Sequence, residues 1–382
     1  MSSNLELNNI QNLEQIVKFI EIGCIPEVST NENQLAKQLK IKPLDILHSC
    51  IYLCGEHCQS DFQWSNTENH RLMNLCIVKL CSLLHYSNID ELFAHVNISK
   101  MFAGLLHKLE NENWKKYPAA VECFMWILKY LKMPRLNNIL HLVMPLPLNI
   151  FDNYQDSNRL LALDAFQHII DNTPAAELAM SGYDIVLLKS LESGLQSFPC
   201  ELIPNLLRCI LSLISKMQMK HLTKKNSIEW TEFDNVMNIL LPRMEMDHKT
   251  EAIECFASIW PIVLESVGFA CIRWSKRLIP LFAEYIMQEH ATLATVKAIE
   301  VFITQTWPKS NTYWNVLLAI LIKALYNEDK TQPKKENILA IEECIKTLKA
   351  SRPECINPIL TKFKECKEFQ SKKIFKESLK KL

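Results

Sequence analysis

The sequence predicts an all-α fold built from repeated helix pairs, and three observations support this prediction. Only 6 of the 382 residues are glycine, whereas phosphate-binding loops and all-β folds draw heavily on residues that tolerate positive φ. A five-residue motif recurs at nearly regular intervals, and a proline follows each copy. The chain is also longer than one compact core, so several domains or an elongated array are expected.

The motif reads alanine, a branched apolar residue, an acid, any residue and phenylalanine. It starts at residues 120, 162, 252 and 298, with a decayed copy at 340, so the steps are 42, 90, 46 and 42. The step of 90 is close to two units, and the missing copy fits Leu206–Ile210, where Arg208 replaces the acid. A weaker match, Cys76–Leu80, lies one unit before the first copy.

The spacing within the motif predicts one buried stripe per helix. Apolar residues at i, i+1 and i+4 share one helix face, whereas i+2 turns away from it. The repeat core is therefore expected to contain Phe124, Phe166, Phe256 and Phe302. Each copy is followed by a proline that would end or kink the helix; these are Pro134, Pro174, Pro261, Pro308 and Pro353.

A second apolar helical stretch fills each unit, for example residues 185–195, 271–287 and 314–326. Two helices per 42 to 46 residues is the period of HEAT and armadillo repeats. We therefore expect a HEAT/armadillo-like helical-repeat solenoid of about seven helix pairs. The alternative is a long helical protein whose helices are loosely similar and irregularly spaced.

Three segments are predicted along the chain. Residues 1–70 lack a clear copy of the motif and are expected to form an N-terminal helical cap, and residues 71–366 the HEAT-like solenoid. Residues 367–382 are expected to be a basic C-terminal tail, because residues 362–382 hold eight lysines and three glutamates. Such a segment is typical of a solubilising helix, a docking tail for an acidic partner or, less often, a nucleic-acid contact.

Composition and motifs argue against catalysis and against several partner classes. Lys+Arg and Asp+Glu both count 42, so the strongly basic footprint of nucleic-acid binders is missing. The N-terminus does not resemble a signal peptide, and the longest apolar run, Val316–Ile322, is too short to cross a bilayer. These features predict a soluble intracellular protein whose cysteines are reduced.

No phosphate-binding loop, nucleophile elbow or zinc-protease motif is present, so we expect no enzyme activity and no cofactor. Cys50, Cys54, His57 and Cys58 are residue types that bind zinc. Their spacing, however, places them in one stripe of a single helix, which favours a packed helix face over a metal site.

The acid of the motif recurs on the side of the helix opposite the core stripe. It is predicted to be either a solvated face or an acidic ladder that faces a basic partner segment. The ladder would comprise Glu122, Asp164, Glu254, Glu300 and Glu342, and Arg208 would interrupt it.

Residues 140–330 resemble a known family. The resemblance is carried by Arg159–Leu163 with His168–Ile170, Asn172–Leu178, Met244 and Glu245 with His248, Arg273 with Lys276–Leu278, and Thr306–Lys309. These segments are similar to the Tti-two family, named for interaction with Tel-two, and the similarity fades over the first 130 residues.

The resemblance implies a non-enzymatic scaffold subunit of a co-chaperone complex with two other helical-repeat subunits, Tel-two-like and Tti-one-like. Acting with the ninety-kilodalton heat-shock chaperone, such a complex stabilises and matures phosphatidylinositol-kinase-related kinases and supports DNA-damage signalling. A cytoplasmic and also nuclear location is expected. The alternative is an unrelated helical-repeat adaptor, such as a transport receptor or phosphatase scaffold.

Four matched residues are candidate partner contacts: Arg273, Lys276, Arg277 and Trp307. The structural alternative for Trp307 is that it packs between repeat units. Neither a metal, nor a nucleic acid, nor a membrane is expected as a partner of the chain.

Overall fold

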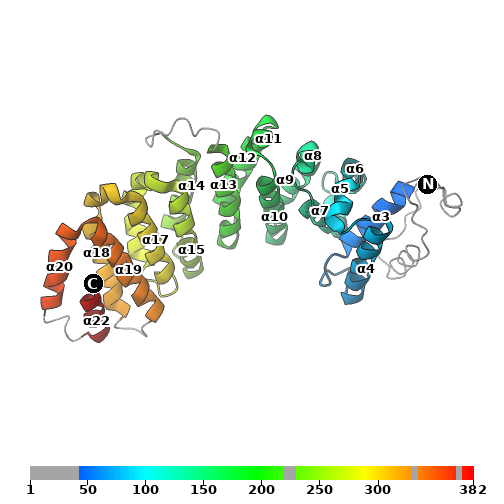
Figure 1. The fold of residues 1–382 in the computed structure, drawn as a ribbon. Helices are drawn as coiled ribbons and strands as arrows, with labels where there is room; N and C mark the ends of the chain where they lie inside the picture. The colour runs from blue at the N-terminus through cyan, green and yellow to red at the C-terminus, as the bar shows by residue number, and fades with distance from the viewer. Residues whose placement is uncertain (1–42, 219–228, 329–333, 367–371) are drawn as a thin grey trace. The chain divides into compact units, whose positions relative to one another are not determined.

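The computed structural model describes residues 43–218, 229–328, 334–366 and 372–382. Within these ranges the regular elements are all helices, which confirms the predicted all-α fold (Figure 1). The chain divides into two compact units, residues 1–181 and 182–382. Most of the expected N-terminal cap lies outside the described residues.

The first unit is a set of helices packed around α7. It contains α3 (Pro43–Glu56), α4 (Thr67–Leu83), α5 (Ile89–His95), α6 (Ile98–Leu109), η1 (Asn113–Lys116), α7 (Pro118–Lys129), α8 (Arg135–Val143), α9 (Pro145–Phe151), α10 (Asp156–Asn172) and α11 (Ala175–Met180). Helix α7 packs against α3, α6 and α10, and α10 packs closely on α9. The copies of the motif at residues 120 and 162 therefore lie on adjacent helices.

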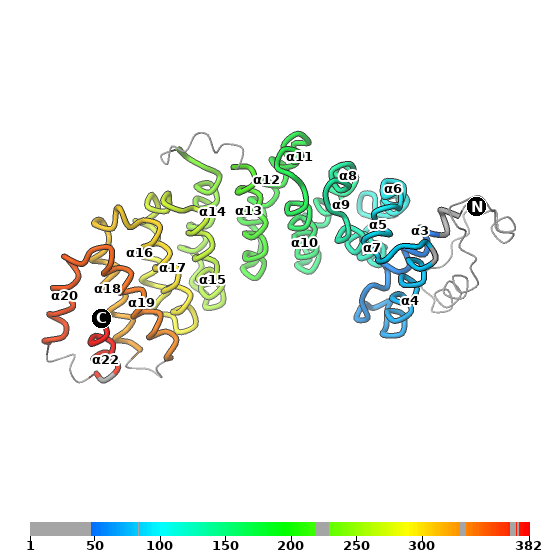
Figure 2. Tube along the Cα trace, viewed as in Figure 1, coloured from blue at the N-terminus to red at the C-terminus, as the bar shows by residue number. Residues whose placement is uncertain are grey.

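The second unit has two layers of helices. Its elements are α12 (Tyr183–Ser197), η2 (Cys200–Leu202), α13 (Ile203–Gln218), α14 (Glu232–Met246), α15 (Thr250–Val267), η4 (Gly268–Trp274), α16 (Ser275–Tyr285), α17 (Thr292–Thr306), η5 (Trp307–Thr312), α18 (Trp314–Glu328), α19 (Lys335–Ser351), α20 (Pro353–Glu365) and α22 (Lys373–Lys381). The motif helices α13, α15, α17 and α19 stack in sequence, and α12, α14, α16 and α18 form the second layer (Figure 2).

The motif phenylalanines lie in the interior of the two units. Phe124, Phe166, Phe256 and Phe302 are fully buried. Three of them contact other aromatic rings: the ring centroids are 5.2 Å apart for Phe124 and Phe102, 5.4 Å for Phe166 and Phe151, and 5.0 Å for Phe302 and Tyr313. The fifth position of the four intact motif copies therefore supplies a large apolar side chain to the core.

The prolines act in different ways along the array. Pro174 caps the start of α11 and Pro353 opens α20, as expected for residues that follow a helix end. Pro261, in contrast, lies inside α15, which continues to Val267. Trp260 before this proline and Val263 and Leu264 after it are buried, so both parts of α15 pack in the core.

One predicted repeat position is wrong. Cys76–Leu80 lies in α4, which packs on α3 and α5, and the helix that packs extensively on α7 is α3. Helix α3 has the same i, i+1, i+4 stripe in its buried Cys50, Ile51 and Cys54. The last turn of α3 also contains Gly55, where an added Cβ would lie 2.6 Å from the Cys123 sulfur, so only glycine allows this close approach.

The predicted segment boundaries at residues 70 and 367 stay predictions. In the structure, α22 lies within the predicted basic tail and packs on α19 and α20. Its Phe375 and Leu379 are buried, and Lys381 pairs with Glu342 at 3.0 Å. By length and composition, one stretch of the described residues, Thr250–Tyr285, is apolar enough to cross a membrane; Phe256, Trp260 and Phe282 within it are core residues of the second unit.

Candidate interaction site

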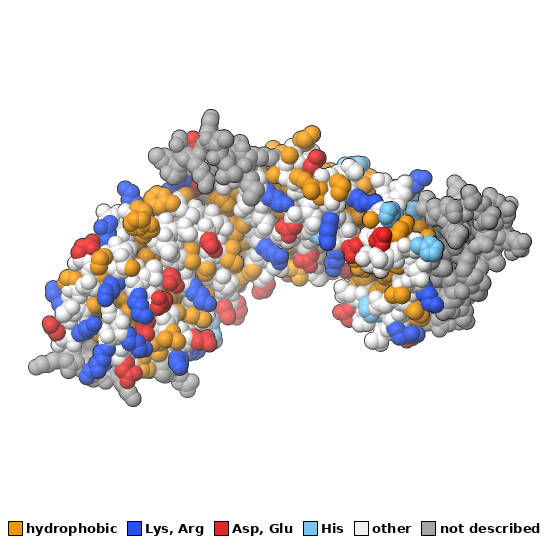
Figure 3. Space-filling view, in the orientation of Figure 1, with side chains coloured by type: hydrophobic (Ala, Val, Ile, Leu, Met, Phe, Trp, Pro, Cys, Tyr) orange, Lys and Arg blue, Asp and Glu red, His pale blue; other side chains and the backbone are white. Residues whose placement is uncertain are grey.

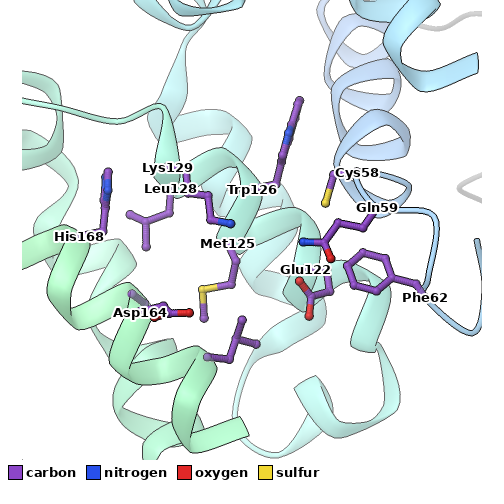
Figure 4. Close-up of a pocket in the computed structure, with 12 residues that line it drawn as sticks. Cys58, Gln59, Phe62, Glu122, Met125, Trp126, Leu128, Lys129, Asp164 and His168 are labelled. Carbon is purple, nitrogen blue, oxygen red and sulfur yellow. The ribbon is translucent and has the colours of Figure 1, made fainter. Parts of the chain in front are cut away.

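A cavity of about 250 Å³ opens in the first unit beside α7. One wall is the turn that follows α3, and the other walls are α7 and α10 (Figure 4). We call this cavity the α7 groove, and its lining comprises Cys58, Gln59, Phe62, Glu122, Met125, Trp126, Leu128, Lys129, Leu161, Asp164, Ala165 and His168.

Hydrogen bonds hold the turn after α3 in place. The Trp64 indole N–H donates to the Glu56 carbonyl oxygen at 2.8 Å, and His57 Nδ1 lies 3.1 Å from the Ser65 hydroxyl. Phe62 stacks on Trp64, with ring centroids 5.0 Å apart. These contacts fold the turn back against α3 and present Phe62 at the groove.

The floor of the groove is apolar. Met125, Leu128 and Ala165 are buried, and Trp126 is half-buried. Trp126 is fixed by edge-to-face contacts with Phe93 and Tyr130, at 5.6 and 5.4 Å between centroids. A fixed aromatic ring beside an adaptable methionine is a combination common in protein-binding surfaces.

Two carboxylates of the motif face the groove. Glu122 on α7 and Asp164 on α10 lie on either side of Met125 in Figure 4. Burial raises the pKa of Glu122, the Lys129 ammonium opposes that shift, and the Asp61 carboxylate adds to it. Burial together with the nearby Glu122 carboxylate raises the pKa of Cys58 to about 11, so this thiol is protonated at neutral pH.

His168 closes the α10 side of the groove in a structural role. Its Nε2–H donates to the Leu131 carbonyl oxygen at 2.8 Å. The Asn172 side-chain amide donates to the His168 carbonyl oxygen at 2.9 Å. His168 thus joins α10 to the chain that follows α7.

The predicted arginine contacts are used within the second unit. Arg273 donates to Asp234 at 2.6 Å, and Asp234 is fully buried. Asp234 also accepts from the Trp274 indole at 3.2 Å and forms the capping box of α14 with Thr231. These bonds tie η4 to the start of α14.

Arg277 forms a second tie between the same layers. It donates two bonds of 2.6 Å to the carboxylate of Glu245, which hold the pKa of Glu245 below its ordinary value. The two guanidinium groups therefore join α14 to η4 and α16, as bidentate arginine pairs typically do.

Lys276 and Trp307 are the two candidate contacts that face solvent. Lys276 is exposed, and Trp307, at the start of η5, is 61% exposed. The alternative that Trp307 packs between repeats is therefore wrong. Figure 3 shows charged side chains of both signs interspersed over the second unit.

The motif acids have separate roles instead of forming one ladder. Glu254 is exposed, Glu300 accepts from the Thr347 hydroxyl at 3.2 Å, and Glu342 is only 3% exposed and pairs with Lys381. Only Glu122 and Asp164 line the α7 groove. The recurrence of these acids was visible in the sequence. The position of the turn residues Gln59 and Phe62 in the same groove was not.

The cysteine stripe of α3 is packed inside the first unit. Cys50 and Cys54 are buried, and burial raises the pKa of Cys50. A hydrogen bond with the Cys76 side chain, together with burial, raises the pKa of Cys54. Across the described ranges, no group of three or more His, Cys, Asp and Glu residues is arranged to hold a metal ion.

Comparisons with known proteins identify one family. The model of the Tti2 family matches residues 94–294, just over half of the 382 residues, and includes α7 and α10. The human TELO2-interacting protein 2 is 28% identical over 324 residues, which are 81% of this chain and 63% of that protein. The mouse protein of the same name is 28% identical over 229 residues, or 58% and 45%.

The chain thus spans less than two thirds of the length of these curated relatives. Among solved structures, an engineered protein covers 98% of this chain and 92% of its own, at 10% identity and a TM-score of 0.40.

Proposed function

The chain belongs to the Tti2 family, and we propose that it is the non-enzymatic scaffold subunit of a co-chaperone complex. In this proposal it binds a TELO2-like protein and a second, Tti-one-like, helical-repeat subunit. The complex acts with the ninety-kilodalton heat-shock chaperone to stabilise and mature phosphatidylinositol-kinase-related kinases, in the cytoplasm and also in the nucleus.

The observation that carries the proposal is the family match over residues 94–294. The name of the human and mouse relatives, TELO2-interacting protein 2, supports the TELO2-like partner. The fold supports a scaffold, because stacked helix pairs expose long surfaces for other proteins.

Depletion of the protein tests the proposal in the cell. Several kinases of the family should fall in abundance together, because clients that fail to mature are degraded. Their transcripts should stay constant, which separates a loss of protein stability from a loss of expression. Normal levels of every such kinase after depletion would contradict the proposal.

Co-purification distinguishes the proposed complex from other scaffolds. Tagged full-length protein should retain two further large helical-repeat proteins in stoichiometric amounts. A transport receptor would instead release its cargo in response to a small GTPase, and a phosphatase scaffold would retain a phosphatase catalytic subunit.

A further inference from the structure

We propose that the α7 groove binds a segment of a partner protein that carries an arginine or lysine next to a bulky apolar residue. The basic side chain would lie between Glu122 and Asp164, and the apolar side chain would cover Met125 and Trp126. The inference depends on the proposed scaffold role in one respect, namely that the partner is a protein.

The charges of the groove favour a cationic occupant. Glu122 is partly buried, and Asp164 is exposed at the edge of the same cavity. The nearby Asp61 adds a third negative charge that acts on Glu122, against one exposed cation, Lys129. A desolvated carboxylate is costly unless a cation or hydrogen-bond donors satisfy it. A guanidinium group from a partner would supply both.

The repeat itself produces this pair of acids. Glu122 and Asp164 are the third residues of successive motif copies, on helices that pack side by side. At the same position in the second unit, Glu300 and Glu342 have partners within the chain, Thr347 and Lys381. The acids of the groove thus differ from equivalent acids that serve the fold.

The apolar lining favours a polypeptide over a free inorganic or small organic cation. Buried Met125 and Leu128 with half-buried Phe62 and Trp126 line the cavity beside the acids. A volume of about 250 Å³ is large enough for one or two side chains but too small for a folded domain. Tryptophan and arginine are also the residue types that contribute most to binding at interfaces.

A random-peptide phage library, selected on the immobilised full-length chain, tests the proposal without a known partner. The enriched sequences are expected to share one arginine or lysine beside an aromatic or aliphatic residue. A synthetic peptide of the enriched sequence, labelled with a fluorophore, then gives the affinity by anisotropy.

The variants Glu122→Gln and Asp164→Asn should each weaken that peptide about tenfold or more, because a hydrogen bond between charged groups is lost. The matched control is Glu254→Gln, which neutralises an exposed acid at the same motif position outside the groove and should leave the affinity unchanged. A peptide with citrulline in place of arginine should bind wild type weakly, and should bind the Glu122→Gln variant with the same affinity as wild type.

The proposal is overturned if no sequence is enriched, if the enriched peptides lack a cation, or if both groove variants bind as tightly as the control. Thermal melts of the variants guard against misfolding, since neither substitution removes a buried apolar side chain. The assay involves no kinase and no other subunit, so it succeeds or fails independently of the proposed function.

Discussion

Glu56 is a buried acid at the end of α3 whose ionisation opposes folding. It is 5% exposed, and its Oε2 atom has no hydrogen-bond partner. Burial raises its pKa from 4.5 to about 7, although Lys108 opposes this shift. Between these two pKa values the folded state retains a proton that the unfolded chain releases, so the contribution of Glu56 to stability is fully present below pH 4.5 and is lost as the pH rises through about 7.

Replacing Glu56 with glutamine should remove this pH dependence. One pKa unit corresponds to about 1.4 kcal/mol, so the raised pKa of Glu56 should cost wild type about 3 kcal/mol of stability by pH 8. Urea unfolding at pH 5 and pH 8 measures it: the difference between the two pH values should be smaller in Glu56→Gln than in wild type. Identical differences in the two proteins would show that Glu56 does not ionise in this range.

Phe256 tests whether the motif marks the repeat core. It is fully buried on α15, so Phe256→Ala should cost about 3 to 5 kcal/mol of unfolding free energy. Phe269→Ala is the control, since Phe269 in η4 is 37% exposed and should cost distinctly less. A loss below about 1 kcal/mol for Phe256→Ala would reject the assigned register.

At the scale of elements, Asp234 joins α14 to η4. It is fully buried and accepts bonds from Arg273, Trp274 and Thr231. Asp234→Ala should therefore cost about 3 to 5 kcal/mol, because it leaves a partly buried guanidinium without its partner. Glu245→Ala breaks the more exposed pair with Arg277 and should cost about 1 kcal/mol or less.

Chemical denaturation of both variants checks this difference. Trypsin digestion gives a second reading, because loosening of η4 from α14 should expose the bond after Arg273 in Asp234→Ala alone. Equal losses of stability in the two variants would mean that burial does not set the strength of these ties.

The helices could be predicted from the sequence where the motif is strong. The apolar stripe identified the helices that became α7, α10, α13, α15, α17 and α19. It missed the role of α3, because Cys50, Ile51 and Cys54 keep the spacing of the stripe but not its alanine and phenylalanine. Packing depends on apolar shape at those positions, which a strict residue motif does not capture.

The interaction site could be predicted only in part. The recurring acids Glu122 and Asp164 were visible as a repeat, but Phe62 and Gln59 reach them through a turn that has no periodicity. The arginines looked like surface cations because their acids are distant in sequence: Asp234 lies 39 residues before Arg273, and Glu245 lies 32 residues before Arg277.

Across the whole molecule, two of the four predicted partner contacts are used within the fold and two are exposed. Reversing the charge of Arg273 or Arg277 would disturb ties between α14 and the elements that follow, so a loss of binding in such variants would not identify an interface. Lys276 and Trp307 have exposed side chains on the second unit, and their replacement tests binding separately from folding.

Trp307→Ala is therefore the sharper test of a partner surface. The side chain is 61% exposed, so the unfolding free energy should change by about 0.5 kcal/mol or less. If Trp307 contacts the TELO2-like subunit, its truncation should weaken that association about tenfold or more, since exposed tryptophans are typical anchors of interfaces. Binding is measured with purified subunits by calorimetry.

Met180→Ala, which removes an 83% exposed side chain from the first unit, is the control and should bind as wild type does. Equal affinity of wild type and Trp307→Ala would exclude η5 from the interface and leave Lys276 as the remaining candidate of the four.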